Sequence, residues 1–177
     1  RDLSSVVTGL IIPMLMTPAI DLPIVVAASL FAILVCKAPF GGTGHNIFNP
    51  AAAGVAFATI CWSDQIFSYT QPLTHLPGGI PRLDLTELLL GNFPGPIGST
   101  YTLIIAASLL YLLARNVVKW YSVLAYILPV AAIAAVSHPY GVSPAESIAY
   151  ELFAGSLFFV AVFIVSDPVT SACAPAL

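Results

Sequence analysis

The sequence predicts an all-α membrane protein, a multi-pass bundle of transmembrane helices in which some helices are broken or re-entrant. Two observations lead to this fold class. First, 59% of the 177 residues are hydrophobic and 7% are charged, whereas soluble globular chains carry roughly 25% charged residues. Second, six apolar segments follow one another, separated by polar or Gly/Pro-rich stretches. A soluble domain of this length could not hide so much apolar surface, because small folds keep a large exposed area. The expected surroundings are therefore a lipid bilayer.

The six apolar segments differ in length. A full crossing needs about 20 apolar residues, which 117–136 and 148–166 reach, whereas the other four are shorter or interrupted. Interrupted segments at membrane depth are tolerated where their backbone is buried in protein or lines a cavity, and such broken helices build the binding sites of transporters. The segments in order are 5–20, 24–36, 47–62, 101–114, 117–136 and 148–166.

Local signals mark where these segments start and break. Prolines interrupt the first segment, and a glycine cluster separates the second from the third. An Asn-Pro pair near the start of the third segment and an Asp-Pro pair after the last one are candidate helix N-caps. These residues are Pro13 and Pro18; Gly41, Gly42 and Gly44; Asn49 with Pro50; and Asp167 with Pro168.

The basic residues predict a topology. If each segment crosses once, four of the five Lys and Arg residues share one side, which the positive-inside rule makes cytoplasmic. Residues 63–98 then form an external loop of one transmembrane domain, 1–177. This loop is longer than usual connections; its aromatic residues favour packing against the protein, and the alternative is a disordered linker. The four basic residues are Arg1, Lys37, Arg115 and Lys119, and the fifth is Arg82.

Several classes of function are excluded by the composition. A net charge of −3 gives no reason to expect nucleic-acid binding. The three cysteines lack CxxC or Cys/His spacing, so no metal site is expected. No Ser/His/Asp arrangement or carboxylate pair indicates hydrolytic catalytic residues. The chain starts at Arg1 and ends soon after a polar motif, so we expect a longer protein, truncated here at both ends.

The densest candidate site is the stretch 40–50. Its glycines, Gly41 and Gly42 among them, let backbone approach a ligand or a second helix closely. The N–H groups at the helix start after Asn49 favour an anion or an electron-rich ring. Asn46 and Asn49 add neutral hydrogen-bonding groups, which cost less to bury than charges. The alternative is a tight interhelical turn with capping asparagines.

A second candidate site is the stretch 166–171, which contains Asp167 and Thr170. Carboxylates within a membrane are costly and are therefore functional candidates. Asp167 could bind Na⁺, relay a proton or accept a hydrogen bond from a flavin, so we place Asp167 and Thr170 on an ion or proton pathway. The alternative is a helix cap at the membrane interface.

A third candidate site leads into the segment 101–114. Gly98, Ser99 and Thr100 precede this helix and could cradle a phosphate at its N-terminus. The lysine of a P-loop is missing from this stretch, so nucleotide hydrolysis is not implied.

These three stretches, in this order and between these helices, resemble one family. It comprises the D-type subunits of the Rnf complexes, which are ferredoxin:NAD⁺ oxidoreductases, and the B-type subunits of the Na⁺-translocating NADH:quinone reductases. The similarity spans nearly the whole chain, and we favour the Rnf-type branch. The matching residues are Thr8-Gly9-Leu10, Phe40-Gly41-Gly42, Asn46-Ile47-Phe48-Asn49-Pro50-Ala51, Leu90-Gly91-Asn92, Gly95-Pro96-Ile97-Gly98 and Asp167-Pro168-Val169-Thr170.

The resemblance implies a ten-helix subunit of an ion-translocating oxidoreductase in a bacterial or archaeal cytoplasmic (inner) membrane. Such a subunit relays electrons through FMN while the complex moves Na⁺ or H⁺, and its activity requires the other membrane and peripheral subunits. Riboflavin is a second flavin that the resemblance leaves open. The competing interpretations are a channel or transporter of the urea-transporter type without redox function, and a purely structural membrane subunit.

The resemblance also implies an attachment point for FMN. In the family, the flavin phosphate is joined to a threonine of the external loop. Gln71 stands at that position here, and Thr70 precedes it. We expect FMN near Thr70, Gln71, Gly98, Ser99 and Thr100, with covalent attachment through Thr70 and binding without a bond both open.

Overall fold

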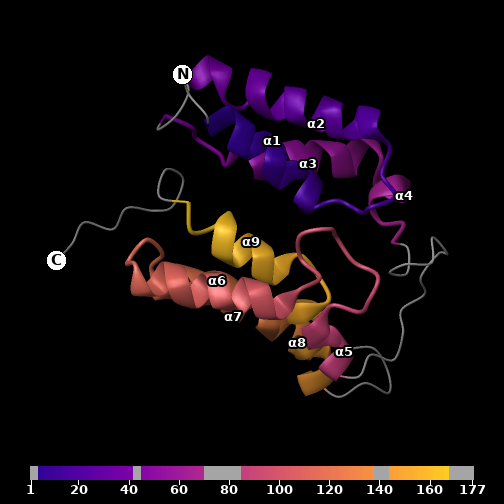
Figure 1. Cartoon of the computed structure of the whole chain (residues 1–177), viewed down its shortest axis with the longest axis vertical. Helices are drawn as coiled ribbons and strands as arrows, with labels where there is room; N and C mark the ends of the chain where they lie inside the picture. Colours follow the sequence, from indigo (N-terminus) through magenta and orange to yellow (C-terminus); the bar gives the residue numbers. More distant parts are fainter. Residues whose placement is uncertain (1–3, 42–44, 70–84, 138–143, 168–177) are drawn as a thin grey trace.

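A computed structural model describes residues 4–41, 45–69, 85–137 and 144–167 (Figure 1). Within these ranges the chain is helical and contains no strand, as the sequence predicts. The elements in order are α1 (Ser4–Met14), α2 (Leu22–Leu34), the 3₁₀ helix η1 (Ala38–Phe40), α3 (Pro50–Cys61), α4 (Ser63–Ile66), α5 (Leu85–Leu90), α6 (Thr102–Ala114), α7 (Trp120–Val136), α8 (Pro144–Phe153) and α9 (Leu157–Phe163).

The first three helices pack together in the upper part of Figure 1. Small residues let α2 and α3 approach closely, as is common between membrane helices. A Cβ atom added at Gly54 of α3 would lie 2.8 Å from the carbonyl oxygen of Ala28 and 3.0 Å from the Cβ of Ala32, both on α2. The two alanines are fully buried. Gly54 therefore sets the distance between these two helices.

The later helices form a second group in the lower part of Figure 1. Helix α9 packs against both α6 and α7. Leu15, just after α1, joins the cluster of buried residues that includes Ile105 of α6 and Phe159 of α9. Ala52 and Val55 of α3 pack against the same cluster. The two groups therefore meet at the end of α1 and along the first half of α3.

The successive segments alternate in direction. The turns that join α2 to α3 and α6 to α7 lie at the left end of the molecule in Figure 1, and the loops around α4 and α5 lie at the right end. Lys37, Arg115 and Lys119 belong to the left-hand turns, so these three residues share one end, as predicted. Arg1, the fourth residue of the set, and Arg82 lie outside the described residues. Which end faces the cytoplasm stays a prediction.

Three predicted segments differ in length from expectation. The segment 117–136, predicted to be long enough for a full crossing, forms the 17-residue helix α7. The segment 148–166 is not one helix, because the chain breaks at Ala154–Ser156 between α8 and α9. Gly155 favours this break, since glycine is a poor helix former. The second segment is longer than predicted: the helical stretch Leu22–Phe40 is, among the described residues, the one long and apolar enough to cross a membrane by length and composition. α1, α3, α6 and α7 are shorter apolar helices.

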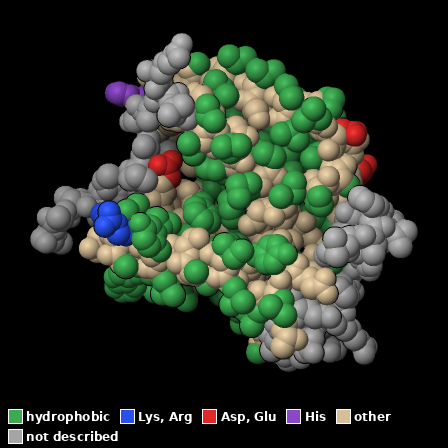
Figure 2. Space-filling model, viewed as in Figure 1, with side chains coloured by type: hydrophobic (Ala, Val, Ile, Leu, Met, Phe, Trp, Pro, Cys, Tyr) green, Lys and Arg blue, Asp and Glu red, His purple; other side chains and the backbone are tan. Residues whose placement is uncertain are grey.

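Side-chain type varies across the surface. In Figure 2, hydrophobic side chains spread over the middle of the face, and charged side chains lie towards its left and right margins. Trp120 and Tyr121 form an edge-to-face pair at the start of α7, and the ammonium group of Lys119 lies 5.7 Å from the Tyr121 ring centroid. Such aromatic and basic residues are enriched where helices leave a membrane.

The described parts of the predicted external loop pack against the protein. Ile66 and Phe93 are buried, and α4 and α5 are helical. Among the aromatic residues that favoured packing, Phe93 lies inside the protein, whereas Phe67 is 61% exposed. The middle of the loop lies outside the described residues.

Cysteine labelling is expected to place residues 63–98 outside the cell. In a variant without the native cysteines, Ser68→Cys should react in intact cells with a maleimide that cannot cross membranes, because Ser68 is exposed. The matched control is Val117→Cys, which is exposed in the α6–α7 turn and should react only after permeabilisation. The opposite pattern would invert the topology.

Candidate functional site

The clearest polar contact joins the start of α3 to the chain just after α9. The Asn49 side-chain oxygen accepts hydrogen bonds from the backbone N–H groups of Ala51 and Ala52, at 3.0 Å and 3.2 Å. The predicted N-cap with a proline at the first helical position is therefore confirmed. The Asn49 side-chain nitrogen donates to Oδ2 of Asp167 at 3.2 Å. One amide thus caps a helix and binds a carboxylate.

Asp167 is half-buried against the stretch that the sequence singled out. Its backbone N–H donates to the carbonyl of Ile164 at 3.2 Å. The hydroxyl of Ser166, which is buried, donates to the carbonyl of Ala161 at 3.0 Å. These bonds hold the carboxylate near the N-terminus of α3, where the helix dipole favours negative charge. The predicted contact of Asp167 with the Gly41–Asn49 stretch is present, whereas Thr170 lies outside the described residues.

Asn46 adds an unused acceptor to this region. Its side-chain oxygen is buried and has no hydrogen-bond partner among the described residues. An unsatisfied buried polar atom costs about 1–3 kcal/mol, so it indicates a site for a donor. Around it the stretch is neither fully buried nor fully solvated: Ile47 and Phe48 are exposed, and Pro50 is buried.

The glycines of this stretch make a turn. Gly41 ends η1 in the left-handed conformation, with φ of 93°, which glycine adopts without strain. A Cβ at this position would meet no atom within 4 Å, so the glycine serves the turn and not a close approach. Gly42 lies outside the described residues, and the depth of the stretch in a membrane stays a prediction.

The third predicted site has a different organisation from the expected phosphate cradle. The backbone N–H of Gly98 donates to the Met14 carbonyl at 2.7 Å, and that of Ile97 donates to the Met16 carbonyl at 3.0 Å. The Ser99 N–H donates to the Pro96 carbonyl at 3.2 Å. These amides are engaged by the protein itself, and α6 begins only at Thr102. A phosphate here would need other donors, such as the hydroxyl of the half-buried Thr100.

The amides of Ile97 and Gly98 compensate for the early end of α1. The last carbonyls of a helix have no partner within the helix, and the two amides satisfy those of this broken helix. A Cβ at Gly98 would lie 2.7 Å from the Cβ of Met14, which explains the glycine. In the sequence, Pro13 and Pro18 indicate that the helix ends early and leaves carbonyl groups in need of partners. Nothing in the sequence marks the carbonyls of Met14 and Met16 in particular.

The same end of α1 binds the other flank of the external loop. The fully buried Thr17 donates its hydroxyl hydrogen bond to the Ser68 carbonyl at 2.9 Å. Ser68 lies two residues before Thr70, which is itself outside the described residues, as is Gln71. Next to them, burial raises the pKa of the Tyr69 phenol. The structure therefore brings the chain leading to Thr70 and the chain leading to Gly98 to one place.

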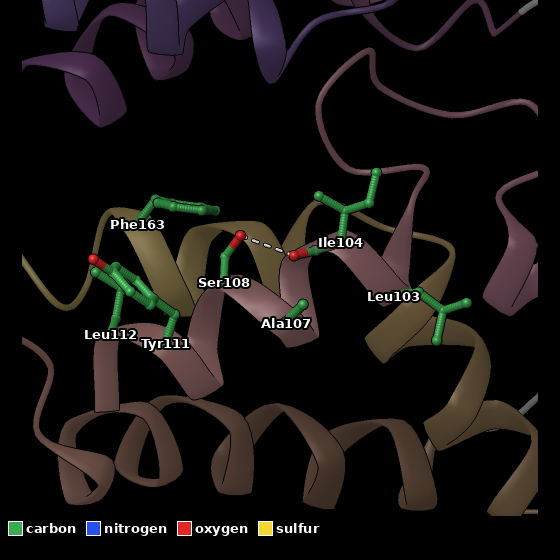
Figure 3. A pocket seen from close by; sticks show the side chains of 7 residues that line it. All are labelled: Leu103, Ile104, Ala107, Ser108, Tyr111, Leu112 and Phe163. Carbon is green, nitrogen blue, oxygen red and sulfur yellow. Dashed lines mark hydrogen bonds between the residues drawn. The ribbon is translucent and has the colours of Figure 1, made fainter. Parts of the chain in front are cut away.

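A groove beside α6 has the wrong chemistry for a specific ligand site. It has a volume of about 590 Å³ and is lined by α6 and by Phe163 of α9 (Figure 3). The hydroxyl of Ser108 is bonded to the Ile104 carbonyl at 2.8 Å. Ligand pockets need a few polar groups that fix orientation, and the walls here are almost entirely apolar. The lining residues are Leu103, Ile104, Ala107, Ser108, Tyr111, Leu112 and Phe163.

Comparison with known proteins gives relatives of two kinds. The chain is 28% identical over 191 residues to the B-type subunit of the Na⁺-translocating NADH-quinone reductase of Klebsiella pneumoniae, covering 93% of this chain and 46% of that protein. It is 28% identical over 193 residues to the D-type subunit of the proton-translocating ferredoxin:NAD⁺ oxidoreductase complex of Clostridium ljungdahlii, covering 96% and 58%. It is 27% identical over 214 residues to the D-type subunit of the ion-translocating oxidoreductase complex of Stutzerimonas stutzeri, covering 96% and 60%.

The chain thus spans about half to three fifths of the length of these relatives. Both kinds match to a similar degree, so the preference for the Rnf-type branch stays a prediction. The sequence model of the NQR2, RnfD, RnfE family matches residues 1–176. Because this match covers almost the whole chain, the protein belongs to the NQR2, RnfD, RnfE family.

Proposed function

We propose that this chain is part of the flavin-binding membrane subunit of an Rnf-type, ion-translocating ferredoxin:NAD⁺ oxidoreductase. The observation that carries the proposal is the family match over residues 1–176, together with relatives named as subunits of ion-translocating oxidoreductases. The helical stretch Leu22–Phe40 and the shorter apolar helices support a position in a membrane. We propose that the chain crosses it several times and that it is a bacterial or archaeal cytoplasmic membrane. The partners are the other membrane and peripheral subunits, and activity requires the whole complex.

The FMN site is proposed where the two flanks of the external loop meet the end of α1. The Thr17–Ser68 and Met14–Gly98 hydrogen bonds support it, because they bring both flanks together. The backbone amides of Gly98 and Ser99 are already bonded within the protein and do not fit a phosphate site. The residues fit a phosphoflavin only through side-chain hydroxyls, which must supply the phosphate contacts. Thr70 and Thr100 carry these hydroxyls, with Gln71 as a neutral hydrogen-bonding neighbour. When bound, the flavin supplies the electron-transfer chemistry, and the protein positions and tunes it.

A second flavin site is proposed at the opposite end of the molecule, in the stretch 41–49. The buried, unpartnered oxygen of Asn46 supports it, because riboflavin offers N–H and O–H donors. Asn49 and Gly41 are proposed to complete this site, together with Gly42, which lies outside the described residues. Asp167 and Thr170 are proposed to lie on the path of the transported Na⁺ or H⁺, because an intramembrane carboxylate has to be compensated by function or by a partner.

The purified protein is expected to show a flavin absorbance spectrum. A fluorescent band that survives denaturing electrophoresis and disappears in Thr70→Ala would establish a phosphoester at Thr70. Loss of the band in Thr74→Ala instead would place the bond at Thr74, the next alternative in the loop. A dark band from a protein with flavin absorbance would mean binding without a bond. A preparation of the complete complex without any flavin on this subunit would contradict the proposal and favour a transporter without redox function.

A further inference from the structure

We infer that Asn49 is a positioning residue for Asp167, with its orientation set by the N-terminus of α3. The inference rests on the proposed function, because that function places Asp167 on the path of the transported ion. Asn49 would be the residue that positions Asp167 for this role. The two residues are separated by 118 positions in the sequence. Their contact therefore links the start of α3 to the end of α9, two elements with no local connection.

The orientation of the Asn49 amide follows from its hydrogen bonds. The side-chain oxygen faces two N–H donors, those of Ala51 and Ala52. A flipped amide would put its NH₂ group against these donors, so the oxygen must face the helix. The NH₂ group is then directed to Oδ2 of Asp167, at 3.2 Å. The cap of α3 thus fixes which atom meets the carboxylate.

This orientation fixes one oxygen of Asp167. Because an NH₂ group only donates, Oδ2 of Asp167 has to accept in this contact. The hydrogen bond restrains rotation of the carboxyl group and holds it at one place. A carboxylate fixed in this way is pre-arranged for a cation, whereas a freely rotating one would have to be ordered first.

Asn49→Ser separates the two roles of the amide. Serine caps a helix about as well as asparagine, but it is shorter and lacks the NH₂ group that reaches Asp167. In the complete complex carrying Asn49→Ser, we expect the apparent KM for the transported cation to rise about tenfold with a smaller change in kcat. Asn116→Gly, in the exposed α6–α7 turn with φ of 53°, is the control and should leave both constants unchanged.

A double-mutant cycle with Asp167→Asn decides whether Asn49 acts through Asp167. In the Asp167→Asn background, adding Asn49→Ser should change the KM by less than about twofold. An equal tenfold rise in both backgrounds would overturn the inference, because Asn49 would then act on the ligand directly. An unchanged KM in Asn49→Ser alone would overturn it as well.

Thermal unfolding of the wild type, Asn49→Ser, Asp167→Ala and the double variant tests the contact without reference to activity, because alanine removes the acceptor that Asn49 binds. Non-additive shifts in Tm support the Asn49–Asp167 bond, and additive shifts contradict it. If the wild-type complex shows no cation-dependent electron transfer, the proposed function fails, and the role on the ion path fails with it. The Tm cycle would still decide the positioning contact, so the two failures are distinguishable.

Discussion

Replacing Gly54 with alanine is expected to destabilise the protein by about 1–3 kcal/mol, the usual cost of overpacking. The new Cβ would lie 2.8 Å from the Ala28 carbonyl oxygen, 3.0 Å from the Ala32 Cβ and 3.1 Å from Cδ1 of Ile12. The first two of these atoms cannot rotate away, so α2 would have to move as a whole. Gly54→Leu should prevent the close packing of α2 and α3 altogether.

The buried thiol of Cys36 supplies a measurement of this effect. With Cys61 and Cys173 replaced by serine, a thiol-reactive fluorophore reports unfolding when heating exposes Cys36. The matched control is Gly9→Ala on α1, where an added Cβ would meet nothing within 4 Å. This variant should be unchanged or stabilised by up to about 1 kcal/mol, because alanine is the better helix former. Equal melting of both variants would show that Gly54 does not set the distance between α2 and α3.

Local signals explain what the sequence predicted correctly about the fold. The Asn49 cap was predictable because Asn-Pro at a helix start depends only on neighbouring residues. The break within 148–166 was not predictable from hydrophobicity, because Ala154, Gly155 and Ser156 are small residues that interrupt an apolar run only weakly. Helix propensity is a weak prior that tertiary packing overrides. The packing of α9 on α6 and α7 depends on residues far away in the sequence, which no short stretch of sequence includes.

Long-range pairs were predictable where the chain offers few polar groups. Asp167 needs a polar partner, and a chain with 7% charged residues leaves few choices, so its contact with the Gly41–Asn49 stretch could be predicted. The role of Gly98 could not be predicted, because a glycine indicates a close approach of two segments but not which segment approaches. Here the partner is the Met14 backbone at the end of α1, and the sequence interpretation assigned these amides to a phosphate instead.

Asp167→Asn is expected to lower the ion-coupled turnover of the complete complex at least about tenfold, which corresponds to about 1.4 kcal/mol in the activation free energy. The variant removes the negative charge and preserves the shape of the side chain. Its amide oxygen can still accept the hydrogen bond from Asn49, so the contact between α3 and the end of α9 should persist. Subunit assembly and flavin content should therefore stay near wild-type levels while cation uptake into proteoliposomes falls.

Asp21→Asn is the matched control for this loss. Asp21 also lies at the end of an interrupted apolar segment, at the N-cap of α2, but its exposed side chain makes no capping hydrogen bond. Removing the charge of Asp21 should leave turnover and cation uptake unchanged. The comparison then shows that the loss in Asp167→Asn comes from the half-buried carboxylate bonded to Asn49, and not from the loss of any one carboxylate. If Asp167→Asn retains full turnover and full cation uptake, the carboxylate only stabilises the start of α3 through the helix dipole. The ion path would then have to run through other residues.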